Sequence, residues 1–106
     1  MDSILSQLAR SLGSDFTEAT KIAVWNKAFI VPSQAANVIR KDACGAWIKW
    51  ADYGNTASQW GWEIDHIFPK ILGGGDEVSN LQPLQWQNNR AKGDSSALAC
   101  PVKAAV

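Results

Sequence analysis

The stretch WEIDHIFPKILGGGDEVSNLQPLQWQNNRAKGD, residues 62–94, decides how this chain folds. Its first seven residues alternate large apolar and polar side chains, which predicts a β-strand that Pro69 ends. Three consecutive glycines predict a loop, and NLQPL predicts a second short strand, which Pro83 restricts to an edge or a terminus. QWQNNRAKG contains good helix formers and ends at Gly93. The order strand, glycine loop, strand and helix predicts an α+β fold.

The chain upstream of this stretch is predicted to be mostly helical. The apolar residues of MDSILSQLARSLG fall on one helical stripe. SDFTEATKIAVWNKA predicts a second helix, with Ser14 or Asp15 as its N-cap and Thr17 in its first turn. Residues 34–43 are ambiguous and allow a third helix, whereas AWIKW, residues 46–50, alternates like a short strand.

Length and composition are those of one small globular domain. The chain has 106 residues, of which 46% are hydrophobic and 19% charged. We divide it into an N-terminal helical extension (residues 1–32), a lead-in (33–61), the central motif (62–94) and a C-terminal tail (95–106). The formal net charge is zero. Bulk electrostatics therefore does not favour nucleic-acid binding, and any such function must rest on a local patch.

The two cysteines, Cys44 and Cys100, are too few for a disulfide framework and form no C-x-x-C pair. Two free thiols in a reducing compartment are therefore expected, with a single bridge as the alternative. The N-terminus lacks the basic and long apolar regions of a signal peptide. No stretch approaches the roughly 18 apolar residues of a membrane span. The expectation is a soluble, cytoplasmic protein without membrane contact.

His66, the only histidine, directly follows Asp65. A carboxylate is a hard ligand suited to Mg²⁺ or Mn²⁺, and a neutral imidazole can take a proton from water near neutral pH. Metal and base together can hydrolyse a phosphodiester. Strict alternation would point the two side chains to opposite faces, so both serve one phosphate only if the strand twists or ends there, as Pro69 allows. Taken alone, a single histidine is more often a structural residue that holds hydrogen bonds.

The wider pattern closely resembles the HNH endonuclease motif, whose fold is the ββα-metal hairpin and helix. The resemblance covers residues 62–94, where the matching elements agree in order and spacing: Asp65-His66-Ile67, Pro69, the glycine loop, Asn80-Leu81-Gln82-Pro83-Leu84, and Asn89-Arg90 with Lys92-Gly93-Asp94. The upstream DACGAWI and YGNTASQWGW also look like the lead-in of small bacterial and phage members. The resemblance implies a small ββα-metal core with additional N-terminal helices.

The resemblance also implies a role for each matching residue. His66 matches the general base, and Asp65 matches the first metal ligand. Asn80 matches the middle asparagine, which ties the loop back and helps orient the base. Asn89 matches the last motif position, where other members carry His or Asn as a metal ligand, so the chain is an H-N-N variant by its letters. Asn88 is the alternative ligand if the helix is offset by one residue.

The expected metal follows from the ligand types. A carboxylate oxygen and an amide oxygen form a hard set, which favours Mg²⁺ or Mn²⁺ over Zn²⁺. Many family members also hold a structural zinc with two C-x-x-C pairs. Here Gln85 and Asn88 stand in place of the second pair, and Cys44-Gly45 is at most a remnant of the first, so no structural zinc is expected. Rigidity is expected to come from tryptophan packing, by Trp47, Trp50, Trp60, Trp62 and Trp86.

Three basic residues are candidates for DNA phosphate contacts. Arg90 and Lys92 lie beside the proposed ligand on the predicted helix, and Arg40 is a further candidate upstream. Asp76 and Glu77 follow the glycines but lack the spacing of an EF-hand, so a calcium loop is not expected.

The resulting hypothesis is a metal-dependent DNA endonuclease of the HNH type. It is expected to nick DNA or to cut it with weak sequence specificity, because the chain has no zinc finger, helix-turn-helix signature or basic arm. The alternatives are a catalytically weak nucleic-acid-binding module of the same fold and a nuclease toxin domain. The expected partners are DNA and, by family analogy, a second copy of the chain or a phage DNA-packaging protein.

Overall fold

The computed structural model describes residues 16–103. In this range the chain is an α+β fold with two α-helices and two small antiparallel sheets. The helical stripe predicted near the N-terminus lies outside the described residues. The elements follow one another as α2 (Glu18–Trp25), β1 (Phe29–Ile30), β2 (Ile39–Lys41), β3 (Trp47–Lys49), β4 (Trp62–His66), β5 (Leu81–Gln85) and α3 (Trp86–Lys92).

The β4–β5 ribbon forms where the sequence predicts two strands around a glycine loop. The strands pair antiparallel, with Trp62 opposite Gln85 and His66 opposite Leu81. Pro83 fits because, within the described residues, the sheet has two strands, so Pro83 lies on an edge strand. The loop between them is less irregular than predicted, because it contains two short 3-10 turns, Lys70–Leu72 and Val78–Asn80.

α3 begins directly after β5, as predicted. Its N-cap is Gln85, whose side chain accepts hydrogen bonds from the backbone N–H groups of Gln87 and Asn88. Its C-cap is Gly93, with a positive φ of 55° that other residues rarely adopt. These two caps fix where α3 begins and ends, and therefore which of its side chains lie beside β4.

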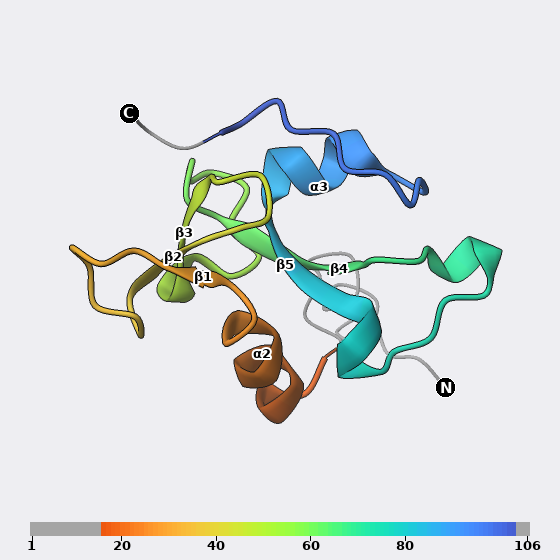
Figure 1. The fold of residues 1–106 in the computed structure, drawn as a ribbon, viewed down its shortest axis with the longest axis horizontal. Helices are drawn as coiled ribbons and strands as arrows, with labels where there is room; N and C mark the ends of the chain where they lie inside the picture. Colours follow the sequence, from red (N-terminus) through yellow and green to blue (C-terminus); the bar gives the residue numbers. More distant parts are fainter. Residues whose placement is uncertain (1–15, 104–106) are drawn as a thin grey trace.

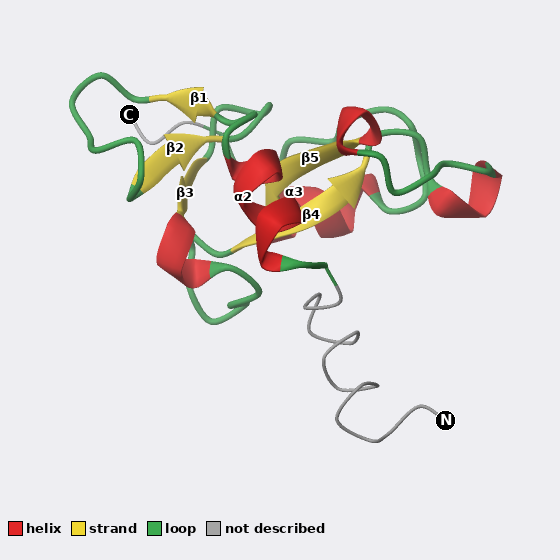
Figure 2. Cartoon of the chain, turned by 90° about the horizontal axis from the view of Figure 1, so that it is seen from below, coloured by secondary structure: helices red, strands yellow, loops and turns green. Residues whose placement is uncertain are grey.

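The two helices lie on opposite sides of the β4–β5 ribbon (Figure 1). Figure 2 shows the same arrangement from below, with the β1–β3 sheet beside the ribbon. This explains why four consecutive residues of β4, from Trp62 to Asp65, are buried although the sheet is two strands wide in the part of the chain that the structure describes. One face of β4 packs against the tryptophan core, and the other carries Glu63 and Asp65 toward α3.

Trp62 lies at the centre of the core. It is fully buried, and its ring centroid is 5.2 Å from that of Trp25, 4.8 Å from Tyr53 and 6.0 Å from Trp50. Such tilted and edge-on aromatic pairs contribute beyond their buried area. The prediction of tryptophan packing is thus confirmed for Trp62, and Trp25 joins it from α2. The remaining tryptophans are only half-buried: Trp47, Trp50, Trp60 and Trp86.

Residues 34–43 are not helical, so that interpretation is wrong. They form turns followed by β2, in which Arg40 lies opposite Ile48 of β3. Pairing with β3 outweighs the local helix preference, as tertiary contacts commonly do. The strand predicted in AWIKW is confirmed, because Ala46 and Ile48 are buried while the intervening Trp47 is half-buried.

The start of α2 also differs from the prediction. Thr17 is the N-cap, because its hydroxyl accepts a hydrogen bond from the backbone N–H of Thr20 at 3.1 Å. Its predicted place inside the first turn is therefore wrong, and the candidate caps Ser14 and Asp15 lie outside the described residues.

No helix within residues 16–103 has the length and apolar character needed to span a membrane.

Cys44 and Cys100 form a disulfide, so the prediction of two free thiols is wrong. The bridge joins the turn between β2 and β3 to the segment after α3. That segment is brought back by Asn88, whose amide pairs with both the N–H and the C=O of Val102. The contact between segments 56 residues apart depends on the path of the chain and has no local sequence signal.

Removing the bridge should destabilise the fold. Because the two cysteines are 56 residues apart, we expect the double variant Cys44→Ser with Cys100→Ser to lose about 2–5 kcal/mol of unfolding free energy. Urea unfolding followed by tryptophan fluorescence measures this loss. A reductant should lower the stability of the wild type and leave the double variant unchanged. Two alkylatable thiols in the air-oxidised protein would contradict the bridge.

Candidate active site

β4 ends with the two residues that the sequence singles out. The carboxylate of Asp65 is buried and faces α3, where its Oδ1 lies 3.2 Å from the Lys92 ammonium. Its Oδ2 accepts a hydrogen bond of 2.9 Å from the Gln82 side chain on β5. Lys92 also donates to the backbone carbonyl of His66 at 2.9 Å. The carboxylate is thereby fixed from two elements, and the last residue of β4 is tied to α3.

The His66 side chain is held by the loop between β4 and β5 rather than by α3. Its Nε2 lies 2.7 Å from Oδ1 of Asp76, a residue of the glycine loop. Lys70 lies 3.8 Å from the same oxygen. The pKa of Asp76 is held below its ordinary value, chiefly by the hydrogen bond from His66; burial acts in the opposite direction, and the charge of Lys70 lowers the pKa further. Asp76 therefore carries a full negative charge at neutral pH.

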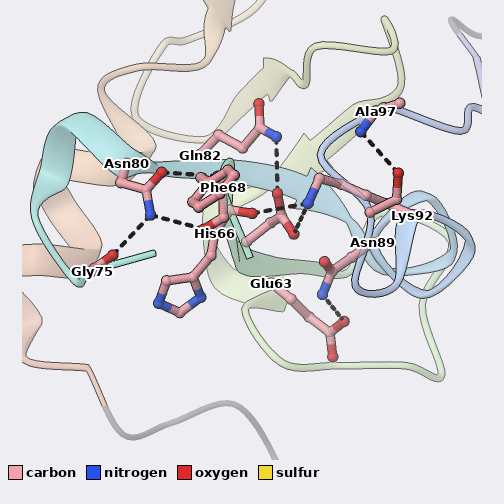
Figure 3. A network of polar contacts seen from close by, with 11 residues as sticks. Glu63, His66, Phe68, Gly75, Asn80, Gln82, Asn89, Lys92 and Ala97 are labelled. Atoms are coloured by element: carbon pink, nitrogen blue, oxygen red, sulfur yellow. Dashed lines mark hydrogen bonds and ion pairs between the residues drawn. The ribbon is translucent and has the colours of Figure 1, made fainter. Parts of the chain in front are cut away.

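Asn80 ties the glycine loop back, as the resemblance implies for its position. Its Oδ1 accepts from the Phe68 N–H at 2.9 Å, and its Nδ2 donates to the carbonyls of Phe68 and Gly75 (Figure 3). Gly74 completes the closure, because a Cβ there would lie 1.8 Å from the Phe68 carbonyl oxygen. The loop is thus anchored immediately before Asp76.

The two candidate asparagines on α3 have different surroundings. Asn88 is fully buried and bonds to the Asp42 carboxylate and to Val102. Asn89 is half-buried, and its Nδ2 donates to Glu63 at 2.9 Å. The Asn89 oxygen points away from Glu63 (Figure 3), and among residues 16–103 it has no hydrogen-bond partner, so this end of the amide can accept from another group. Among the two, Asn89 is the residue that can offer an oxygen to a ligand.

A hollow of about 280 Å³ opens between the end of β4 and the end of α3. Asp65, His66 and Asn89 all line it, together with Lys70 and Asp94. The structure thus brings three of the predicted site residues to one cavity, although Asp65 and His66 are adjacent on a strand. Both reach it because β4 ends at His66. Asn80 does not line the hollow; it holds the loop between β4 and β5 in place through Phe68 and Gly75.

The three predicted phosphate contacts differ in their access to solvent. Arg90 is 58% exposed at the side chain and forms a two-pronged ion pair with Glu63, at 2.8 and 3.2 Å, which raises its pKa. Lys92 is buried against Asp65, so a direct phosphate contact would require that ion pair to open. Arg40 donates to backbone carbonyls, those of Asn26, Ala28 and Ala36, and lines a separate pocket with Trp25 and Trp50.

Three residues of the site were not identified from the sequence: Glu63, Asp76 and Gln82. Glu63 could have been predicted from the sequence, because strand alternation puts it on the same face as Asp65. Gln82 was harder to predict, since its position opposite Asp65 depends on the register of the two strands. Asp76 could not be predicted, because its contact with His66 depends on how the loop closes.

The donor atoms fit a hard cation with few protein ligands. The carboxylate of Asp65 and the amide oxygen of Asn89 are the ligand types that Mg²⁺ and Mn²⁺ accept, and Mg²⁺ usually keeps several waters. Within residues 16–103 no group of three or more His, Cys, Asp or Glu side chains could enclose a metal ion. Any cation here would therefore share its coordination sphere with water or with substrate oxygens.

No family model, curated protein or solved structure matches this chain. The function of the site is therefore argued from its geometry and chemistry.

Proposed function

We propose that the chain is a metal-dependent DNA endonuclease of the HNH type, with β4, β5 and α3 as its ββα-metal core. The observation that carries the proposal is the common hollow lined by Asp65, His66 and Asn89. A base beside two hard oxygen donors is the minimum set for metal-assisted phosphodiester hydrolysis. The order and spacing of the matching residues, from Asp65 to Asp94, support the same reaction.

Each residue has a defined task in this reaction. His66 accepts the proton of the attacking water, and its contact with Asp76 holds the imidazole in the lining of the hollow. Asp65 and Asn89 would hold one Mg²⁺ or Mn²⁺, which when bound offsets the charge that develops on the phosphate and leaving oxygens. Lys92 and Gln82 fix the Asp65 carboxylate, and Glu63 fixes the Asn89 amide. By the resemblance, the products carry a 5′-phosphate and a 3′-hydroxyl.

The test is plasmid cleavage with a choice of metals. Supercoiled plasmid should be converted to the nicked form with Mg²⁺ or Mn²⁺, more slowly with Zn²⁺, and not at all with EDTA. Binding of DNA without cleavage under every metal would instead favour the catalytically weak binding module.

The two neighbouring asparagines give a matched pair of variants. Asn89→Ala should slow cleavage at least about tenfold, because a ligand oxygen is lost, and a higher Mg²⁺ concentration should recover part of the rate. Asn88→Ala should instead lower the unfolding free energy by about 1–3 kcal/mol, because the groups of Asp42 and Val102 that bond to the Asn88 amide lose this hydrogen-bond partner. Cleavage rates and urea unfolding separate the two effects. A metal-rescued defect in Asn88→Ala would reverse the assignment.

Arg90 and Lys92 should differ in DNA binding. Arg90→Ala is expected to reduce the slope of log K against log salt by about one, because its exposed guanidinium can reach a phosphate. Lys92→Met removes the same charge but should leave the slope unchanged, because the ammonium is buried. Binding of duplex DNA in EDTA over a range of NaCl measures both slopes. Equal losses in the two variants would mean that Lys92 reaches the DNA.

The disulfide favours one second candidate, a nuclease toxin domain of the same type. Disulfides persist mainly in oxidising compartments and are rare in the cytosol. The bridge between Cys44 and Cys100 therefore favours a protein that leaves the cytosol. Killing of cells that produce the chain internally, prevented by His66→Ala, would support this candidate. Growth unaffected by the active chain would count against it.

A further inference from the structure

The structure assigns Asp76 as the positioning residue that keeps the His66 proton on Nε2, so that Nδ1 is the atom that takes the proton from water. This inference rests on the proposed function for its meaning in a reaction. Its structural part, the proton position, does not depend on nuclease activity.

The first step in the argument is the direction of the hydrogen bond. Nε2 of His66 and Oδ1 of Asp76 are 2.7 Å apart, which is a short distance of the kind found when one partner is charged. The pKa of Asp76 lies below its ordinary value, chiefly because of this contact. An ionised carboxylate can only accept. The proton between the two atoms therefore belongs to Nε2.

The second step concerns the other ring nitrogen. A neutral imidazole has one protonated nitrogen and one with a lone pair. With the proton on Nε2, the lone pair lies on Nδ1, and within residues 16–103 Nδ1 has no hydrogen-bond partner. The nitrogen that is free to act as a base is therefore Nδ1, and the ring that carries it lines the hollow beside Asp65.

The third step is that Asp76 is itself held in place. Asn80 on the 3-10 turn before β5 donates to the carbonyl of Gly75, the residue before Asp76. The backbone N–H of Gly74 donates to the Pro69 carbonyl at 2.9 Å, and the contact of Gly74 with Phe68 leaves no room for a Cβ. Asn80 thus acts on the base indirectly, by closing the loop that presents Asp76 to His66.

Lys70 is the competing partner for the same carboxylate. Its ammonium lies 3.8 Å from Oδ1 of Asp76, further than the imidazole at 2.7 Å, and its side chain is 64% exposed. An exposed cation at that distance is well screened by solvent. The nearer contact with His66 therefore decides where the Asp76 carboxylate points.

A direct test uses the fact that the chain has a single histidine. In ¹⁵N-labelled protein its two ring nitrogens need no assignment among several residues. In mildly alkaline buffer, the wild type should show a protonated Nε2, an unprotonated Nδ1, and a slowly exchanging ring N–H. An unprotonated Nε2 in the wild type would overturn the inference.

Three variants connect the proton position to the reaction. Asp76→Ala should lose the slowly exchanging N–H signal and cleave about 10- to 100-fold more slowly, as expected when a group that orients an active side chain is removed. Asp76→Asn keeps an acceptor oxygen and should retain the signal and most of the rate. Glu77→Ala removes the neighbouring exposed carboxylate and should match the wild type in both measurements.

The outcomes separate this inference from the proposed function. If Asp76→Ala loses the signal but cleaves as fast as the wild type, the role of Asp76 in the reaction is refuted. If the wild type cleaves nothing with any metal, the nuclease proposal fails, while the ring N–H spectra still decide whether Asp76 holds the proton on Nε2.

Discussion

Replacing His66 by alanine should slow plasmid cleavage by about 10²- to 10⁴-fold, the contribution that a positioned general base makes. The loss should appear at saturating Mg²⁺ as well as at low Mg²⁺, because the imidazole is not a metal ligand in the proposed site. The fold should survive, since the His66 side chain lines the hollow and is not part of the hydrophobic core. Initial nicking rates and the urea midpoint measure the two quantities.

Chemical rescue provides the control for this variant. Added imidazole should restore part of the rate of His66→Ala if the missing function is proton transfer, and it should not affect Asn89→Ala, where a ligand oxygen is missing. A rate equal to that of the wild type in His66→Ala would remove His66 from the reaction, and with it the proposed mechanism.

Replacing Asp42 by alanine should cost about 3–5 kcal/mol of unfolding free energy. Its buried carboxylate accepts four hydrogen bonds, from the backbone N–H groups of Cys44, Ala46 and Gln85 and from the Asn88 side chain. It therefore joins the β2–β3 turn to the point where β5 becomes α3. Without it, the buried N–H groups of Ala46 and Gln85 lose their acceptor, and unsatisfied buried donors are expensive.

A matched pair of variants tests this role. Asp42→Asn keeps one acceptor oxygen but turns an NH₂ group toward donors, so its stability should lie between those of Asp42→Ala and the wild type. Glu77→Ala removes an exposed carboxylate and should change the unfolding free energy by less than about 0.5 kcal/mol. Urea unfolding measures all three variants. A loss below about 1 kcal/mol in Asp42→Ala would show that the disulfide and its neighbours hold the β2–β3 turn against the junction of β5 and α3 without Asp42.

The hydrogen bonds around Asp42 add a source of rigidity that the sequence did not predict, beside the expected tryptophan packing. Gln85 and Asn88 stand at the positions where, by the resemblance, many HNH proteins carry a zinc-binding cysteine pair. In the structure both residues bond to Asp42, and the Cys44–Cys100 bridge lies beside them. Tryptophan packing stabilises the other side of the ribbon, around Trp62. A buried hydrogen-bond network between distant segments leaves no periodic pattern, which is why it could not be predicted.

The proposed reacting residues were predictable from the sequence, whereas most of their partners were not. Asp65 and His66 were predicted from their residue types and Asn89 from the resemblance to the HNH motif, and all three line one hollow. Lys92 was predicted to face DNA but lies inside, because the last turn of α3 places its ammonium over Asp65. Asp76 was considered only for a calcium loop, because its distance from His66 depends on how the glycines turn.

The sequence by itself determined the order of β4, the glycine loop, β5 and α3, because alternation, proline, glycine and helix formers act over a few neighbouring residues. Only the tertiary structure decided three further features: the disulfide, the strand pairing of residues 34–43, and the partner of each site residue. Each of these joins segments more than a few residues apart, where the contact depends on chain path and packing rather than on local preference. The order of the elements therefore came from local patterns, whereas the arrangement around His66 came from the closure of the loop between β4 and β5.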